Sequence, residues 1–440
     1  MSLQVIKWLY PGMNVKRWVL LLAVGIMLIS GGFWLLAGVE ILTLFERNVL
    51  ALLYQVTGRL PPFATTIVAI VFLLMGVTLA SVGIRQTIRT LLFELDPGRA
   101  NNVVDIMFSR RLLRRGPHVV AIGGGTGLST LLRGLKEYTS NITAIVTVAD
   151  DGGSSGRLRE DFGVLPPGDI RNTLVALADA EPLMQELFQY RFPGDNALSG
   201  HSFGNLFITA MNQIAGDFDE AIQLSSKVLA IRGKVLPSTL ESVVLKAEYA
   251  DGCVVTGESH IPLEGKRIRR VFIEPHDVEP LDEALQAIAA ADIIVLGPGS
   301  LYTSIMPNLL VASMVEEIRK SAAVRVYICN VMTQPGETAG YTASDHLRAV
   351  LDHVGPNFVH YCLMNNTTIA EASAKRYRAQ DAYPVVNDPA EVRALGAIPV
   401  MRPLINESNL VRHDPKRLAG AVLELAKHHR VRRYLLNFRK

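Results

Sequence analysis

The sequence of 440 residues predicts an α/β protein with a Rossmann-like, doubly wound and mainly parallel sheet, preceded by two transmembrane helices. Three observations lead to this class. Two long segments near the N-terminus carry no charged residue. From His118 onward, short apolar runs alternate with helical stretches, the pattern of strands joined by crossover helices. Glycine-rich turns follow several of these runs, where a doubly wound sheet binds its ligands.

The charge-free segments cover residues 18–39 and 60–84. Each exceeds the roughly 20 residues that a helix needs to cross a bilayer, so we expect a membrane hairpin over residues 1–84. A signal peptide does not explain the first segment, because it lacks a small-residue cleavage site and a second apolar segment follows closely. A hairpin buried in a globular core is the alternative interpretation.

Basic residues on both sides of the hairpin predict its orientation. Lys and Arg residues precede the first segment and follow the second, whereas the loop between the segments holds two Glu and two Arg. We therefore expect two spans in the cytoplasmic membrane, with both termini and the ligand domain in the cytoplasm. Residues 85–116 form a basic linker. Its run from Arg110 to Arg115 is either solvated or in contact with anionic lipid headgroups.

We place a nucleotide-binding domain at residues 117–430 and a basic tail at residues 431–440. Apolar runs without alternation are typical of strands buried on both faces. Such runs cover residues 118–122, 141–148, 291–297, 325–331 and 358–364. Helical stretches lie between them at residues 126–138, 281–290, 307–319 and 344–353.

Two segments interrupt this alternation. Residues 169–230 are largely helical, with Ser202 and Asp217 placed to cap two helices. Residues 242–261 contain two β-rich runs around the pair Asp251-Gly252, which predicts a hairpin. We therefore expect a helical insertion and a β-hairpin excursion from the main sheet.

The first glycine turn, residues 123–127, follows a predicted strand and opens a predicted helix. It lacks the third glycine of a dinucleotide fingerprint, and no Gly-Lys-Ser/Thr follows as in a Walker A loop. The helix N-terminus behind the turn still attracts a phosphate group. A tight structural turn without a ligand is the alternative.

A second glycine-rich stretch, "ADDGGSSGRL", ends the next predicted strand. Asp150 is placed to accept hydrogen bonds from ribose hydroxyls or to hold a divalent ion, and Ser154 and Ser155 add hydroxyls. The alternative role for these acids is to cap a helix, but capping explains one aspartate better than the adjacent pair Asp150 and Asp151. "GGSSG" also matches the nucleophile elbow of hydrolases. The two acids disfavour an oxyanion there, so we do not expect a serine hydrolase.

The net charge and the cysteine content limit which partners and sites we expect. The net charge of +3 is too small to indicate nucleic acid, so we expect no nucleic-acid partner. The three cysteines form no CxxC pair, and we interpret them as buried thiols in a reducing compartment without a disulfide framework or zinc site.

Six motifs in this order resemble the gluconeogenesis factor, or YvcK-like, family, which is related to the CofD-type 2-phospho-L-lactate transferases. The resemblance covers about residues 117–409, and the membrane hairpin departs from the short soluble members. The motifs are "AIGGGTGLSTLLRGLK", "TVADDGGSSGRLRED", "LPPGDIRN", "SGHSFGNL", "LGPGSLYTSIMPNLL" and "NVMTQPGET".

The resemblance implies roles for particular residues. It implies a pyrophosphate cradle made of Gly123, Gly124, Gly125, Thr126 and Gly127. It implies further ligand contacts from Asp151, Ser154, Ser155, Asn172, His201, Asn205, Gly297, Gly299, Ser300 and Tyr302. Asp150 is the residue implied for Mg²⁺ and for catalysis in the transferase branch. Ordinary capping and packing are the alternatives for Asn172 and Tyr302.

The resemblance also implies a function. The regulatory branch binds a UDP-sugar such as UDP-N-acetylglucosamine and is linked to cell shape, cell-wall synthesis and carbon use. The transferase branch moves a phospholactyl group from a guanosine diphosphate-type donor to a deazaflavin, with Mg²⁺. We expect a membrane-anchored regulator, with the transferase as the alternative. The expected partners are the lipid bilayer, proteins of envelope synthesis and a second copy of the chain. A scaffold without a ligand fits the glycine-rich strand ends poorly.

Overall fold

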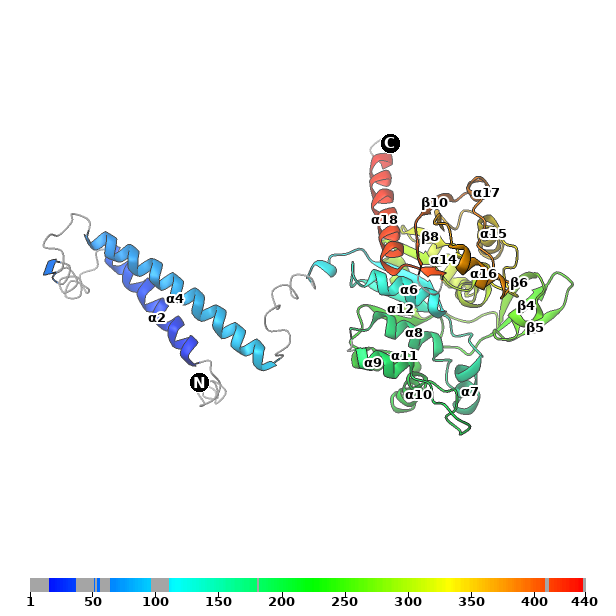
Figure 1. Ribbon diagram of the computed structural model, residues 1–440, viewed down its shortest axis with the longest axis horizontal. Helices are drawn as coiled ribbons and strands as arrows, with labels where there is room; N and C mark the ends of the chain where they lie inside the picture. The colour runs from blue at the N-terminus through cyan, green and yellow to red at the C-terminus, as the bar shows by residue number, and fades with distance from the viewer. Residues whose placement is uncertain are drawn as a thin grey trace. The chain divides into compact units, whose positions relative to one another are not determined.

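The computed structural model describes residues 16–36, 51, 54–55, 64–95, 111–179, 182–407 and 411–437. The chain divides into two units, Met1–Ser109 and Arg110–Lys440 (Figure 1). Each unit has its own contacts and is described separately below.

The first unit is a pair of long helices, α2 (Lys16–Leu36) and α4 (Ala64–Leu95). Glycines lie where the two helices touch: a Cβ added at Gly25 would lie 2.5 Å from the backbone nitrogen of Ala80, and one at Gly76 would lie 2.7 Å from the Gly25 carbonyl oxygen. Small residues allow such close backbone approach between membrane helices. Both helices are long and apolar enough to span a membrane.

The boundaries of the two helices differ from those expected. Residues 37–39 and 60–63 of the predicted spans lie outside the described residues. Helix α4 continues past Ile84 to Leu95, so the first part of the predicted linker is helical. The described residues of the predicted tail likewise belong to a helix, α18 (Pro415–Asn437).

The second unit contains a seven-stranded sheet, ordered β10-β9-β8-β7-β1-β2-β3, in which every neighbouring pair is parallel. This confirms the predicted Rossmann-like class. The strands are β1 (Val119–Gly123), β2 (Ile142–Val146), β3 (Lys234–Pro237), β7 (Ile293–Leu296), β8 (Val324–Ile328), β9 (Tyr361–Asn365) and β10 (Ile398–Arg402).

The chain winds outward from β1 in one direction and from β7 in the other, so the strand order reverses between these two strands. Right-handed crossovers then place helices on both faces of the sheet. On one face α6 (Gly125–Leu135) contacts α8 (Gly168–Leu177) and α18. Two further pairs of helices pack against each other. These are α12 (Asp282–Ala289) with α14 (Ala312–Lys320), and α15 (Ala343–Val354) with α17 (Pro389–Ala394). The reversal leaves a crevice at the carboxyl ends of β1 and β7.

The helical insertion is present. Its helices are α8, α9 (Pro182–Gln189), α10 (Phe203–Ala215) and α11 (Phe218–Val228), and α7 (Gly153–Phe162) precedes it. The predicted caps are confirmed: the Ser202 side chain accepts a hydrogen bond from the Asn205 amide, and Asp217 accepts one from the Glu220 amide. The predicted helix at residues 307–319 is instead divided. A π-helical turn, Leu301–Ile305, and the short α13 (Met306–Leu309) precede α14.

The predicted hairpin is also confirmed and gains a third strand. β4 (Val244–Tyr249) pairs antiparallel with β5 (Val254–Thr256) and with β6 (Ile268–Glu274). A short 3₁₀ helix (Ile261–Glu264) lies between β5 and β6. Cys253, in the turn of the hairpin, is exposed, so the expectation that all three thiols are buried is wrong. The polar Asp251-Gly252 turn keeps its neighbour at the surface.

Two further elements complete the unit near the crevice. Helix α16 (Glu371–Arg378) follows β9, and β11 (Ile405–Glu407) pairs antiparallel with β12 (Val411–His413). Both supply side chains to the site described next.

Candidate functional site

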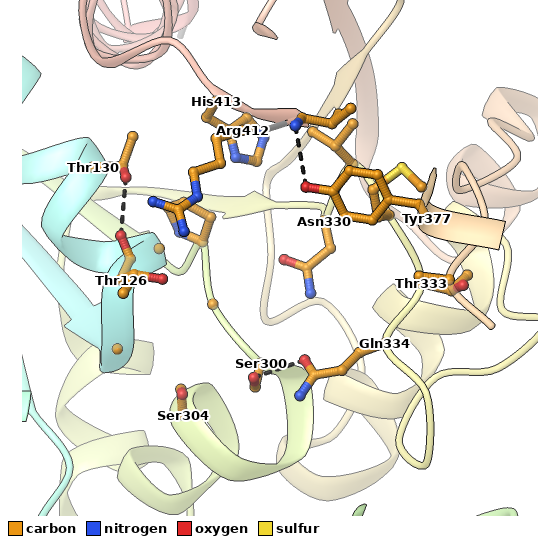
Figure 2. Close-up of a pocket in the computed structure, with 18 of the residues that line it drawn as sticks. Thr126, Thr130, Ser300, Ser304, Asn330, Thr333, Gln334, Tyr377, Arg412 and His413 are labelled. Atoms are coloured by element: carbon orange, nitrogen blue, oxygen red, sulfur yellow. Dashed lines mark hydrogen bonds between the residues drawn. The ribbon is translucent and has the colours of Figure 1, made fainter. Parts of the chain in front are cut away.

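A cavity of about 440 Å³ lies at the carboxyl ends of β1, β7 and β8, the place where the strand order reverses (Figure 2). Loops that follow these three strands form its walls, and α16 and β12 close it. It is lined by Gly124, Gly125, Thr126, Gly127, Thr130, Pro298, Gly299, Ser300, Ser304, Asn330, Val331, Met332, Thr333, Gln334, Pro335, Tyr377, Gln380, Ala382, Val411, Arg412 and His413.

The glycines of the first loop are required for three different reasons. Gly124 lies directly against the Asp169 carboxylate, where a Cβ would collide. Gly125 has φ +65°, a left-handed conformation that side chains disfavour. At Gly127 a Cβ would lie 2.5 Å from the Pro298 carbonyl oxygen. The loops after β1 and β7 therefore touch backbone to backbone, which only glycine permits.

Helix α6 begins at this loop without a side-chain cap. Its first amide, that of Gly125, donates to the buried carboxylate of Asp169. The following amides of the first turn have no intrahelical partner, as at any helix N-terminus. These donors and the helix dipole favour an anion at the glycine loop.

The opposite wall is neutral and polar. The Ser300 hydroxyl donates to the Gln334 carbonyl oxygen at 2.7 Å, and the Gln334 amide donates to Glu337 at 2.5 Å. Asn330 and Thr333 extend the same wall (Figure 2). Amide and hydroxyl groups of this kind suit the donors and acceptors of a base or a sugar.

Strand β12 supplies two side chains to the cavity. Arg412 extends from it toward the Thr126 end of α6 (Figure 2), and it is the only charged side chain among the described residues that line the cavity. Burial lowers the pKa of His413 to about 4, so its ring is neutral. Its Nε2 atom is buried and has no hydrogen-bond partner among the described residues. The Tyr377 hydroxyl accepts from the Val411 amide at 3.1 Å and fixes the strand.

The cavity brings together only some of the predicted site residues, namely Gly124, Gly125, Thr126, Gly127, Gly299 and Ser300. Gly123 belongs to β1 and Gly297 directly follows β7, and neither lines the cavity. Tyr302 is buried and its hydroxyl pairs with that of Tyr341 at 2.9 Å, which is a packing role. The remaining predicted residues, Asp150, Asp151, Ser154, Ser155, Asn172, His201 and Asn205, form two clusters nearby.

The first cluster joins α7 to α10. The buried Ser154 hydroxyl lies 3.0 Å from His201 Nδ1 and accepts a hydrogen bond from the Asn205 side-chain Nδ2 at 3.0 Å. Burial, and then the neighbouring Arg157, lowers the pKa of His201. The pair is shielded from solvent, and no described carboxylate hydrogen-bonds His201. This arrangement stabilises the helical insertion and does not support a serine nucleophile.

The second cluster consists of carboxyl groups beneath the glycine loop. Burial and the neighbouring Asp150 raise the pKa of Asp169 to about 7. The same two causes raise the pKa of Glu258 to about 8. Burial raises the pKa of Asp150 as well, although its Oδ1 accepts from the Gly152 amide at 2.9 Å. Asp151 is turned away and accepts from the Ser259 amide at 2.8 Å.

Arg171 faces the carboxyl cluster, and Asn172 lies beside it. The Arg171 guanidinium donates to the Asn172 carbonyl at 2.8 Å and to the Ser202 hydroxyl. The Asn172 side chain also hydrogen-bonds Asp169, which keeps Asn172 out of the cavity. The sequence interpretation missed Asp169 and Glu258, although "LPPGDIRN" contains the first of them.

Asp150 and Asp169 offer the oxygen donors that Mg²⁺ prefers, and this ion commonly takes one or two carboxylates and keeps several waters. Burial is the largest cause of their raised pKa values, and the neighbouring Asp150 adds to that of Asp169, so a cation would offset charge at this pair. Among the described residues no group of three or more His, Cys, Asp or Glu side chains is placed to hold a metal. The pair therefore fits a magnesium ion that completes its shell with water or a ligand.

Comparisons with known proteins agree with this architecture. The family model "2-phospho-L-lactate transferase CofD" matches residues 119–405. The gluconeogenesis factor of Bacillus subtilis is 52% identical over 312 residues, which are 71% of this chain and 98% of that protein. A relative from Nostoc sp. that carries the same family name is 48% identical over 424 residues, 96% of this chain and 92% of its own length.

The Nostoc match must extend into the region of α2 and α4, whereas the Bacillus match leaves it out. A crystal structure of a UPF0052 family member from Bacillus halodurans has a TM-score of 0.68 and 52% identity, and covers 70% of this chain and 99% of that one. Nearly all of that relative's chain is matched by 70% of this chain, so a relative of about the length of the α/β unit folds on its own. The chain therefore belongs to the CofD family and, within it, to the gluconeogenesis factors.

Proposed function

We propose that the chain is a membrane-anchored regulator that binds a UDP-sugar of the UDP-N-acetylglucosamine type in the cavity beside α6. One observation carries the proposal: the uncapped N-terminus of α6 and Arg412 face each other across a cavity with neutral amide walls. A helix N-terminus and an arginine bind a pyrophosphate from two sides. The volume of about 440 Å³ lies in the usual range for small-molecule sites.

The position of the charged groups supports binding without turnover. The described cavity lining contains no carboxylate, and its single histidine is neutral and lies beside Arg412. General acid–base chemistry needs a group that titrates near the working pH within reach of the ligand. A regulator of cell shape, wall synthesis and carbon use needs only a ligand-dependent conformation that a partner protein recognises.

Membrane anchoring is supported by the surface of α2 and α4. Met27 is 73% exposed and Leu74 is 65% exposed, although each helix packs against the other. A hairpin in a globular core would bury such side chains, whereas a lipid bilayer provides an apolar solvent for them.

The second candidate is a magnesium-dependent transferase, favoured by the carboxyl cluster of Asp150, Asp169 and Glu258 beneath the glycine loop. In that case Asp150 and Asp169 would hold the ion, which would neutralise phosphate charge during group transfer. The loop that binds a pyrophosphate is the same in both proposals. The two differ only in whether an acceptor is used.

Calorimetry with UDP-N-acetylglucosamine, followed by chromatography of the recovered ligand, tests the function. We expect binding and intact ligand after hours with MgCl₂ and a deazaflavin. We expect Arg412→Ala to weaken binding about 10- to 100-fold, because a charge-assisted hydrogen bond contributes roughly 1.5–3 kcal/mol. The control Arg393→Ala, an exposed change on α17, leaves affinity unchanged. Product formed from a phospholactyl-guanosine donor contradicts the regulator, and no binding of either donor contradicts both proposals.

Reporter fusions test the membrane topology. We expect a reporter at Gly12 and one after Lys440 to be cytoplasmic, and one inserted near Gln55 to lie outside, because the basic residues flank the hairpin. A C-terminal reporter found outside would contradict the topology, since the cavity would then be separated from cytoplasmic nucleotides.

A further inference from the structure

A second cavity, of about 600 Å³, lies at the amino ends of the strands of the main sheet. There His118, Asn141 and Asp292 precede β1, β2 and β7. Helix α18 forms its other side. Three of its side chains are exposed and basic: Arg114, Arg115 and Lys427. The nucleotide site is at the carboxyl ends of the strands, so this cavity is a separate site.

The acidic groups of the cavity are already engaged. The Asp292 carboxylate accepts the His118 amide at 2.8 Å, and Glu424 accepts the guanidinium of Arg402 at 3.4 Å. By contrast, Arg114, Arg115 and Lys427 make no ion pair within the part of the chain that the structure describes. The lining therefore carries three cationic and two anionic side chains, and this small excess of positive charge favours an anion.

The backbone that carries the two arginines is held in place. The Asn141 amide donates to the Arg114 carbonyl at 3.0 Å and to the Gly116 carbonyl at 2.8 Å. The Ser140 amide donates to the Leu113 carbonyl at 3.1 Å. These bonds make the arginines part of a built wall and not of a free tail.

Part of the opposite wall is apolar, although Glu424 and Lys427 of the same helix also lie on it, and it leaves open space. Gly420 lies in α18, and a Cβ added there would meet no atom within 4 Å. Leu423 and Ala426 lie beside it, on the same helix. A cavity with a cationic rim and an apolar wall suits an amphiphile with a phosphate head.

The sequence positions of the residues that line the cavity indicate which amphiphile it binds. In the sequence, only residues 96–110 separate α4 from Arg111. Leu112 is 61% exposed among these arginines, as in segments that lie at a membrane surface. Farther along α18 the sequence adds Arg430, Arg432 and Arg433.

We infer that this cavity binds the phosphate headgroup of an anionic phospholipid, with Arg114, Arg115 and Lys427 around the phosphate and the α18 wall against its glycerol backbone. The inference rests on the proposed membrane anchoring. It goes beyond a general attraction of basic residues to a charged surface, because it requires the space in front of Gly420.

Vesicle sedimentation of residues 110–440 tests the inference, because the Bacillus halodurans relative, of about the length of this unit, folds on its own. We expect at least about tenfold stronger binding to phosphatidylglycerol–phosphatidylcholine vesicles than to phosphatidylcholine alone, roughly 1.4 kcal/mol. We expect the double change Arg114→Ala and Arg115→Ala to remove this preference. The control double change Lys227→Ala and Lys320→Ala removes the same amount of charge at exposed sites elsewhere. It should retain the preference for phosphatidylglycerol vesicles.

Gly420→Met is the decisive variant, because it fills the cavity without altering charge. Methionine is a better helix former than glycine, so the fold should be preserved and the melting temperature should not fall. We expect at least about fivefold weaker vesicle binding, roughly 1 kcal/mol, and unchanged binding of UDP-N-acetylglucosamine. Vesicle binding equal to that of the wild type would overturn the proposal that the cavity binds the lipid. Attraction by surface charge would then explain the vesicle binding.

Two further arms identify the source of the phosphate. Full-length protein purified in a neutral detergent should retain phosphatidylglycerol in a lipid extract, and Gly420→Met should lose it. A short RNA duplex at micromolar concentration should fail to displace the isolated unit from vesicles. Displacement by the duplex would overturn the lipid assignment. The reporter fusions separately test the anchoring on which it rests.

Discussion

Replacing Gly127 with alanine is expected to lower the affinity for UDP-N-acetylglucosamine at least about 100-fold and to destabilise the α/β unit. The new Cβ would lie 2.5 Å from the Pro298 carbonyl oxygen and 2.9 Å from the Gly299 Cα atom. Both neighbours are backbone, so the loop after β7 must move away from α6. Alanine favours a helix over glycine by about 1 kcal/mol, but overpacking of this kind costs about 1–3 kcal/mol and displaces the loop that carries Ser300.

Gly123→Ala is the matched control, because both glycines belong to the same predicted cradle. A Cβ at Gly123 would lie 3.8 Å from Leu128 and from Gly297, an ordinary contact. Alanine also fits a strand better than glycine by roughly 0.5–1 kcal/mol. We expect unchanged affinity and an equal or higher melting temperature for Gly123→Ala. If calorimetry gave the two variants the same affinity, the contact between the two loops would not control the site.

The contrast between these glycines shows what the sequence could and could not predict. A run of glycines after a buried strand predicts a site, but not which of them touches another loop. A side chain is excluded at Gly127 because Pro298 lies against it, and Pro298 is a residue far along the chain that only the fold brings near. The same holds for Arg412, which reaches the cavity from a three-residue strand beyond the motifs used for the prediction.

The fold itself was largely predictable from local pattern. The predicted strands that were confirmed are the interior ones, where both faces are buried and the apolar runs are continuous. The strands of the main sheet that were missed, β3 and β10, are its two edges. Each contains a proline, Pro237 or Pro399, a residue that edge strands tolerate and interior strands do not.

The free energy of unfolding of the α/β unit is expected to fall by about 1–2 kcal/mol between pH 7 and pH 8.5, above the range in which its buried histidines titrate in the unfolded chain. Asp169 and Glu337 have pKa values of about 7 in the folded protein and Glu258 of about 8, against ordinary values of 3.8 for Asp and 4.5 for Glu. Burial is the largest cause in each case. Between these limits the folded state holds protons that the unfolded chain has already lost, so stability decreases as pH rises.

Urea unfolding of residues 110–440 at several pH values measures this loss. Glu258→Gln should reduce the slope, because it removes one buried charge and the repulsion that this charge exerts on Asp150 and Asp169. Glu248→Gln is the control: Glu248 is partly buried, and its hydrogen bond with Arg270 holds its pKa below the ordinary value. It is ionised throughout the range, so its removal should leave the slope unchanged. A flat wild-type profile would contradict the buried cluster.

Magnesium then separates the two proposed functions at the same site. At pH 8.5 the ionised Asp150 and Asp169 side chains repel each other, and a bound cation would replace that repulsion with attraction. A transferase that holds Mg²⁺ there should regain most of the lost stability in about 5 mM MgCl₂, since a ligand at 100 times its Kd contributes about 2.7 kcal/mol. Asp150→Asn should abolish that gain. For the regulator we expect MgCl₂ to have no such effect, and UDP-N-acetylglucosamine to stabilise wild type and Asp150→Asn equally, because the cavity beside α6 does not include Asp150.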